Sequence, residues 1–125
     1  KLFELSGERG YDSEAFIKTF MTTAISKDMD KDFHHVQWAG KEYIMSRMED
    51  ENSVAISNNG VVFDNETLYW TGYIYRYWNI YTGESSKDIY KQASAKTMQT
   101  VYLMYHTMSP ELAIDRLKES YNEKK

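Results

Sequence analysis

The apolar residues of this chain recur every three or four positions in several stretches, which is the spacing of helices with one buried face. The first stretch predicts a helix over 13–27, with Asp12 or Ser13 as its capping side chain. The second predicts a helix over 34–49, where we expect Gly40 to allow close packing against another element. Residues 1–11 carry no sustained period, so we expect a loosely ordered tail or a docking strand there.

The middle of the chain changes its pattern twice. Two short β-branched runs on either side of an Asn-Asn-Gly turn that ends at Gly60 predict a small β-hairpin over 54–63. The next segment, over 66–81, holds seven of the chain's aromatic residues and is apolar on nearly all sides. We therefore expect it to form a central helix that is surrounded by the others and ends at Gly83.

Capping signals predict three shorter helices toward the C-terminus. Ser85 with Asp88 three residues later forms a capping box, and Ser94 begins the next helix. Ser109 before Pro110 is the clearest helix start in the chain, because proline is preset for the first helical position.

The fold expected from these patterns is mainly α. It is a compact bundle of about six helices around the central aromatic helix at 66–81, with a small β-hairpin at 54–63. We expect one domain over 1–125, because no linker, repeat or low-complexity stretch divides the chain. Its two ends, 1–11 and 122–125, are expected to be loosely ordered.

Composition and charge exclude several classes of protein. The 125 residues carry 15 basic and 19 acidic side chains, so the net charge of −4 lacks the basic footprint of a protein that binds nucleic-acid phosphates. The chain has no cysteine, which excludes disulfides, thiol nucleophiles and cysteine zinc sites and fits a reducing compartment. No apolar run approaches the roughly 20 residues of a membrane span. We therefore expect a cytoplasmic protein that contacts neither nucleic acid nor membrane directly.

All of the charge imbalance lies in the first half, because residues 1–63 have a net charge of −4 and residues 64–125 a net charge of zero. An acidic lobe of this kind steers a basic partner, such as a toxin with a basic surface. The alternative, a solvated acidic face that only aids solubility, stays open. The acidic interface candidates are Asp28, Asp30, Asp32, Glu49, Asp50 and Glu51.

No motif of catalysis or metal binding stands out. The chain lacks HExxH, a phosphate-binding glycine loop and the nucleophile elbow of hydrolases. The acids at 28, 30 and 32 begin like a calcium loop, but Phe33 and Ala39 replace its glycine and its bidentate glutamate. The adjacent His34 and His35 would point apart on a helix, and His106 is expected to cap a helix C-terminus. We therefore expect no metal, no cofactor and no catalytic residue.

Arg76 is the most informative single residue, because it lies among tyrosines where an unpaired guanidinium would be costly. It either pairs with an internal carboxylate, grips an anionic ligand in a pocket with Tyr73 and Tyr77, or belongs to an interface. Trp38 and His35 are further candidates for such a ligand site or interface.

The aromatic content, 15% of the chain, also bears on interfaces, because Tyr, Trp, Met and Arg are the residue types enriched where proteins meet. We expect core packing to use most of the aromatic residues in the central helix. The tyrosines left for a partner are then those outside it: Tyr43, Tyr90, Tyr102, Tyr105 and Tyr121.

Four strings in the chain are similar to a known family: HHVQWAGKEYIM at 34–45, YWTGYIYRYW at 69–78, TGESSKDIY at 82–90 and YHTMSPELAI at 105–114. Over residues 12–120 the chain resembles a family of small uncharacterised bacterial proteins that accompany toxin-antitoxin type genes, including genes for toxins of the ADP-ribosyltransferase type. The resemblance implies the role of an antitoxin or accessory protein and carries over no catalytic residue. The basic DNA-binding module and the long disordered tail of other antitoxins are missing, so such an antitoxin would bind as a folded helical domain.

The expected function is therefore a non-enzymatic protein-interaction module, antitoxin-like or accessory, that binds and neutralises or regulates a partner protein. Two alternatives stay open. One is a protein or enzyme that binds a small molecule or nucleotide in a pocket near Arg76, and the other is an acidic inhibitor of a nucleic-acid-binding machine. A homo-oligomer is also among the expectations.

Overall fold

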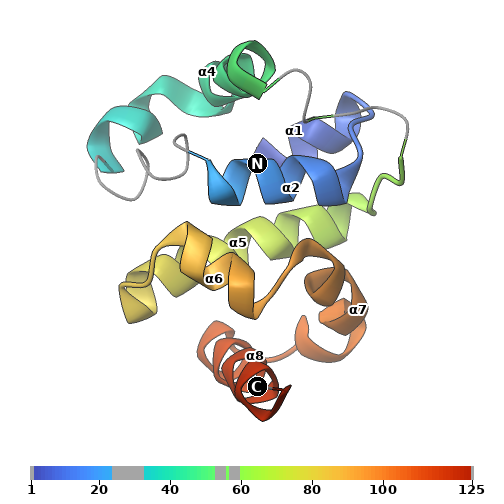
Figure 1. Ribbon diagram of the computed structural model, residues 1–125, viewed down its shortest axis with the longest axis vertical. Helices are drawn as coiled ribbons and strands as arrows, with labels where there is room; N and C mark the ends of the chain where they lie inside the picture. The colour runs from blue at the N-terminus through green and yellow to red at the C-terminus, as the bar shows by residue number, and fades with distance from the viewer. Residues whose placement is uncertain (1, 24–32, 53–55, 57–59, 125) are drawn as a thin grey trace.

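The computed structural model describes residues 2–23, 33–52, 56 and 60–124, without the side chains of 33–39 and 124 (Figure 1). Within this part of the chain the regular secondary structure is helical, which confirms the mainly α prediction. The helices are α1 (Leu2–Glu8), α2 (Ser13–Thr22), α4 (Phe33–Asn52), α5 (Asn65–Thr82), α6 (Ser86–Gln92), α7 (Ala95–Tyr105) and α8 (Pro110–Lys124).

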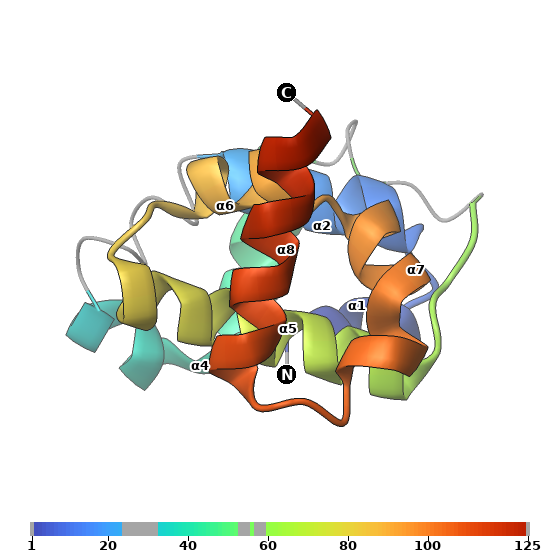
Figure 2. The ribbon, with the colours of Figure 1, turned by 90° about the horizontal axis from the view of Figure 1, so that it is seen from below.

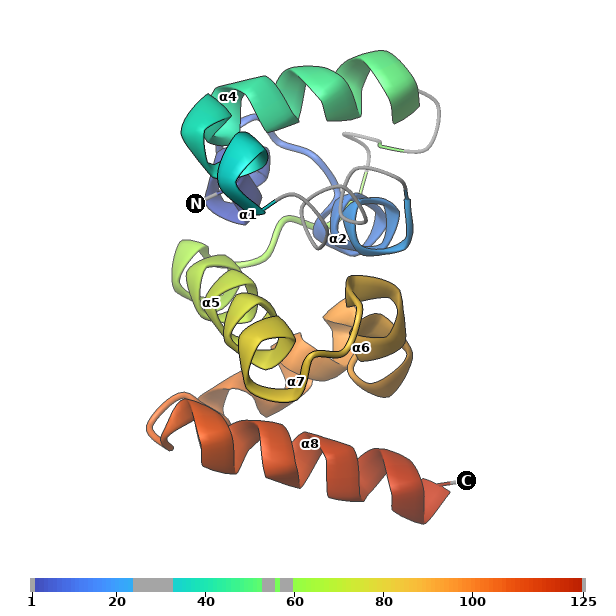
Figure 3. The ribbon, with the colours of Figure 1, turned by 90° about the vertical axis from the view of Figure 1, so that its left-hand side faces the viewer.

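The helices are stacked in layers, as the side view in Figure 3 shows. α4 lies at one end above α1 and α2, α5 lies beside α6 and α7 in the next layer, and α8 closes the other end. α5 packs against α1, α6, α7 and α8, while α8 crosses α5 and also contacts α6 (Figure 2). The aromatic helix therefore lies centrally among four others, but the expectation that the others surround it is wrong, because one of its faces remains in solvent.

The helices begin at the capping residues that the sequence indicates. The Asp12 carboxylate accepts a hydrogen bond from Ala15 N at 2.8 Å, which starts α2. Ser85, Ser94 and Ser109 accept bonds from the backbone N–H three residues later and start α6, α7 and α8. Each cap satisfies a backbone donor that the first helical turn leaves unpaired. The start of each of these helices is therefore fixed by residues close to it in the sequence. The helix predicted over 13–27 ends at Thr22, because Thr23 has an extended backbone with φ −107° and ψ 176°, and residues 24–27 lie outside the described part.

The two chain ends are more regular than expected. Residues 2–8 form helix α1 rather than a tail or strand, and α8 remains helical to Lys124. Phe3 of α1 is 4% exposed and meets the rings of Phe16 and Tyr75 edge-on, at centroid distances of 6.5 and 6.1 Å. A helix of seven residues is too short to stand on its own propensity, so the burial of this ring against α2 and α5 stabilises it.

The β-hairpin predicted over 54–63 is not seen. Residues 54, 55 and 57–59, which include Asn58 and Asn59 of the predicted turn, lie outside the described part, and the described residues 56 and 60–63 form no strand.

The Val-Val-Phe run of the expected hairpin is held by the start of α2 instead of by a partner strand. Ser13 N donates to Val61 O at 2.9 Å, and Phe63 N donates to Ser13 Oγ at 2.9 Å. A Cβ at Gly60 would collide with the Asp12 carboxylate, so close approach explains this glycine. The backbone groups that a second strand would have paired are therefore satisfied by a helix N-terminus.

The helix predicted over 34–49 is present within α4, but it is broken at Gly40. This residue has φ 82° and ψ 171°, a conformation that only glycine adopts readily. A Cβ at this position would meet Glu42 Oε2 at 3.7 Å as its nearest neighbour, which is ordinary contact. Our prediction that Gly40 allows close packing is therefore wrong, and the backbone conformation explains it.

Candidate functional site

The strongest candidate site is a row of four tyrosines along α5. Tyr69, Tyr73, Tyr77 and Tyr81 follow one another at intervals of four residues, which an α-helix places side by side on its surface. Successive ring centroids lie 6.4, 6.1 and 6.2 Å apart, and the planes of the first two rings differ by only 5°. We call these four residues the tyrosine ladder.

The ladder is open to solvent along its length. Tyr69, Tyr73 and Tyr81 are 53%, 45% and 47% exposed, and Tyr77 is half-buried. Ile80 on the same side of the helix is 69% exposed. Single exposed apolar residues are ordinary on a protein surface, but a row of neighbouring large ones is typical of an interaction site.

The opposite side of α5 is buried. Trp70, Tyr75 and Trp78 are at most 7% exposed, and the polar groups of Tyr75 and Trp78 have partners within the molecule. The Tyr75 hydroxyl donates to Ala93 O at 2.6 Å, and Trp78 Nε1 donates to Glu84 Oε1 at 2.8 Å. Burial raises the pKa of Tyr75 well above 10.0, so this hydroxyl stays protonated and serves as a core hydrogen bond.

Two carboxylates border the ladder, and each bonds to a tyrosine. Glu66 in the first turn of α5 accepts from the Tyr102 hydroxyl at 3.4 Å, and Glu111 in the first turn of α8 accepts from the Tyr77 hydroxyl. Burial and then the neighbouring carboxylate raise the pKa of Tyr77 and of Tyr102 above 10.0. Both hydroxyls therefore remain neutral donors at physiological pH.

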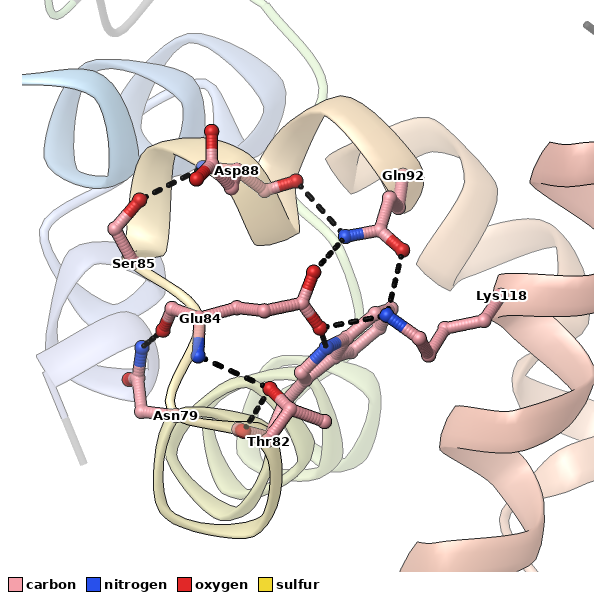
Figure 4. Close-up of polar contacts among 8 residues, drawn as sticks. Asn79, Thr82, Glu84, Ser85, Asp88, Gln92 and Lys118 are labelled. Carbon is pink, nitrogen blue, oxygen red and sulfur yellow. Dashed lines mark hydrogen bonds and ion pairs between the residues drawn. The ribbon is translucent and has the colours of Figure 1, made fainter.

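A separate polar cluster joins α5, α6 and α8 around Glu84 (Figure 4). One carboxylate oxygen of Glu84 accepts from Trp78 Nε1 at 2.8 Å and from Lys118 Nζ at 2.6 Å. The other oxygen accepts from Gln92 Nε2 at 2.6 Å, and Lys118 Nζ also donates to Gln92 Oε1 at 3.1 Å. The cluster thus ties the end of the central helix to the two helices that cover it.

The chemistry of the Glu84 cluster is structural rather than catalytic. Burial on its own would raise the pKa of Glu84, but hydrogen bonds from Lys118, Trp78 and Gln92 outweigh it and lower the pKa from 4.5 to about 2. A carboxylate this acidic is ionised near neutral pH and is a poor general acid or base. Its bonds are made to side chains of the same cluster, which favours a role in holding α8 in place.

The residues singled out from the sequence are distributed unevenly. Tyr73 and Tyr77 belong to the ladder. Arg76 lies half-buried on α5 and is engaged in an interaction within the molecule, so its three interpretations stay predictions. His35 and Trp38 lie in the first turns of α4, where the side chains are outside the described part.

The acidic candidates also separate. Asp28, Asp30 and Asp32 lie outside the described residues. Asp50 is exposed near the end of α4.

The two glutamates of this acidic run are paired within the chain. Glu49 accepts from Arg9 Nη1 at 2.8 Å and from the Tyr11 hydroxyl at 2.5 Å, and Glu51 accepts from Arg47 Nε at 3.0 Å. The hydrogen bonds from Tyr11 and Arg9 lower the pKa of Glu49. The Glu49 cluster therefore fastens the end of α4 to the segment between α1 and α2, and less of this acidity is free for a partner than the sequence indicates.

Two features of the site were missed from the sequence. The four-residue spacing that joins Tyr69 to Tyr81 is visible, but the direction in which this stripe faces is not. Our prediction that core packing uses most aromatics of the central helix is wrong for Tyr69, Tyr73 and Tyr81, which are about half exposed, whereas Tyr75 is buried as expected. Of the tyrosines outside this helix, Tyr90, Tyr102 and Tyr121 are half-buried. Glu84 has no periodic partner in the sequence, so no signal could have indicated its cluster.

Among the described residues, no group of three or more histidine or acidic side chains could hold a metal ion. None of the described helices combines the length and the apolar character that crossing a membrane requires. Comparisons with protein-family models, curated proteins and solved structures find no match.

Proposed function

We propose that this chain is a non-enzymatic protein-interaction module, antitoxin-like or accessory, which binds a partner protein through the tyrosine ladder of α5. The single observation that carries the proposal is the row of four tyrosines, three of them about half exposed, on the most connected helix of the fold. A rigid helix presents these rings in fixed register, so little side-chain entropy is lost when a partner covers them.

The residue type supports binding rather than catalysis. A tyrosine ring offers a large apolar surface, and its hydroxyl forms hydrogen bonds in water or in a partner, which is why tyrosine is enriched in the energetic centres of interfaces. The polar clusters around Glu84 and Glu49 use their charged groups internally, so neither supplies a reactive group to a substrate.

The antitoxin-like role rests on different support. It derives from the resemblance to the family that accompanies toxin-antitoxin genes and from the net charge of −4, which favours a basic partner. A toxin with a basic surface, encoded by the neighbouring gene, is the partner we propose to test first.

The test is co-expression of the tagged full chain with the product of the neighbouring gene, followed by affinity capture and a growth assay for toxicity. The variant is Tyr69→Ala with Tyr73→Ala, which removes half of the ladder. The matched control is Tyr43→Ala, because Tyr43 is 50% exposed but lies on α4.

We expect the parent chain and the Tyr43→Ala chain to retain the partner and relieve toxicity, while the double variant loses at least about tenfold of the captured partner. Circular dichroism confirms that all three chains are folded. Absence of a complex with the parent chain, together with no relief of toxicity, would overturn the proposal. If the double variant captured as much partner as the parent chain, the tyrosine ladder of α5 would not be the interface.

A further inference from the structure

The first two rings of the ladder lie side by side in solvent. Tyr69 and Tyr73 are 53% and 45% exposed, their ring centroids are 6.4 Å apart, and their planes differ by only 5°. Side chains four residues apart on a helix have Cβ atoms about 5–6 Å apart, so the two phenols stay neighbours whatever rotamers they adopt. Two identical phenols are therefore held within reach of one another.

The freedom of the rings distinguishes this pair from the rest of the ladder. Exposed side chains change rotamer within picoseconds to nanoseconds, so the edges of the Tyr69 and Tyr73 rings can meet. Tyr77 is half-buried, and its hydroxyl is bonded to Glu111. Its ring is tilted by 52° and 47° from those of Tyr73 and Tyr81. The open pair is thus the place in the ladder where two rings can approach edge to edge.

The composition of the chain makes these phenols a target of one-electron oxidation. The chain has no cysteine, so no thiol competes for an oxidant or repairs a tyrosyl radical within the molecule. Trp70 and Trp78 are at most 7% exposed and are shielded. An unpaired electron can pass between adjacent phenols of the ladder, because they are the same chemical group, so oxidation at any of its rings can reach the open pair.

We propose that Tyr69 and Tyr73 form a site of oxidative modification, at which a one-electron oxidant joins their rings in a dityrosine cross-link within one chain. This inference goes beyond the proposed function and does not depend on it. It places an oxidation-sensitive pair on the face that we propose for partner binding.

The cross-link replaces two O–H bonds by one carbon–carbon bond. Each phenol gives one electron and its hydroxyl proton to the oxidant, which leaves two phenoxyl radicals. The radicals combine through one Cε carbon of each ring, and the hydrogen on each bonded carbon then moves to the oxygen of its own ring, which restores both aromatic rings. Hydrogen peroxide, acting through a haem peroxidase, takes up the two electrons and two protons and becomes two molecules of water.

The test treats the full chain with hydrogen peroxide and a haem peroxidase. Dityrosine is measured by its fluorescence, and mass spectrometry locates the loss of two hydrogen atoms. Oxidation of methionine adds oxygen instead and is distinguished by mass. The variant is Tyr73→Phe, which keeps the ring and removes the hydroxyl. The matched controls are Tyr81→Phe, at the other end of the ladder, and Tyr43→Phe on α4, since both tyrosines are about as exposed as Tyr73.

We expect the two hydrogen atoms to be lost from Tyr69 and Tyr73 of the same chain. Because one helix holds both rings, the yield per chain should stay constant when the protein is diluted about tenfold. Tyr73→Phe should lower the yield at least about tenfold, while Tyr81→Phe and Tyr43→Phe leave it within about twofold.

The inference is overturned if the cross-link joins two chains, if it maps to another pair of tyrosines, or if Tyr73→Phe gives as much dityrosine as the parent chain. It is also overturned if the parent chain forms no dityrosine under conditions that cross-link free tyrosine. None of these results depends on capture of the partner protein, so the inference and the proposed function fail separately.

Discussion

The two sides of α5 are both rich in aromatic residues, but one side is buried in the core and the other is exposed to solvent. One side places Trp70, Tyr75 and Trp78 in the core, at most 7% exposed. The other side leaves Tyr69 and Tyr73 about half in water. Both sides are aromatic, so aromatic content by itself does not distinguish a core face from a binding face.

The difference lies in the partners of the polar groups. On the buried side the Tyr75 hydroxyl bonds to Ala93 O, and Trp78 Nε1 bonds to Glu84. A buried donor without a partner costs about 1–3 kcal/mol, so an aromatic with a polar tip enters the core where the fold supplies an acceptor. Helices α1, α6, α7 and α8 pack against α5, and the exposure of Tyr69, Tyr73 and Tyr81 shows that the ladder lies on the face that these helices leave open.

The largest expected effect comes from the buried side. Trp78→Ala should lower the free energy of unfolding by about 3–5 kcal/mol, because it leaves a cavity in the core and removes a donor to Glu84. Urea denaturation followed by circular dichroism measures the change. If the alanine variant does not fold, Trp78→Phe, which keeps most of the ring volume, should still lose roughly 1–3 kcal/mol. A loss below about 0.5 kcal/mol would mean that the two sides of α5 do not differ as described.

The Glu84 cluster on the buried side of α5 makes the free energy of unfolding depend on pH. The pKa of Glu84 is lowered from 4.5 to about 2 in the folded chain, so its contribution to stability is complete above pH 4.5 and is lost as the pH falls toward 2. Glu84→Gln should lower the free energy of unfolding by about 2 kcal/mol at neutral pH. Denaturation at pH 6 and pH 3 should therefore differ less for this variant than for the parent chain.

The control for this measurement is Glu119→Gln, an exposed position on α8. Its pH dependence should follow that of the parent, including the part due to Glu49, whose pKa is also lowered. A Glu84→Gln chain with the full pH dependence of the parent would contradict the assignment.

The smallest effect on stability is expected at the ladder. Tyr73→Ala should change the free energy of unfolding by no more than about 0.5 kcal/mol, because its ring is about half exposed and its neighbours belong to the same open row. The same urea titration measures it beside Trp78→Ala. A loss of several kcal/mol would place Tyr73 in the core and remove the ladder as a binding face.

The elements that the sequence predicted well are those with local causes. Ser85, Ser94 and Ser109 start their helices through hydrogen bonds to backbone groups three residues away, and such bonds depend only on nearby residues. The aromatic helix was placed to within one residue at each end for the same reason, since its period and its terminal glycine lie within the segment.

The elements that the sequence missed depend on distant residues. The helix at 2–8 is stabilised by Phe3 against α2 and α5, and the run after Gly60 is bonded by Ser13. The Val-Val-Phe run has strong β propensity. Its backbone nevertheless forms hydrogen bonds with the N-terminus of a helix some fifty positions away, so tertiary contacts outweigh the local preference for a strand.

The candidate site was predicted in part. Tyr73 and Tyr77 were singled out for their place beside Arg76, and they do belong to the ladder. Tyr69 and Tyr81 were not among the site residues that the sequence predicted. Helical periodicity gives the relative directions of side chains around a helix, but it does not give the side on which neighbouring helices will pack.

The sequence by itself determined the helical class, the caps, the extent of α5 and the spacing of its tyrosines, because each follows from interactions within a few residues. Only the tertiary structure decided which stripe of α5 is buried, that Glu84 joins three helices, and that Glu49 is paired with Arg9 and Tyr11. These depend on where α1, α6 and α8 dock, and docking is set by the sum of many long-range contacts that no local pattern contains.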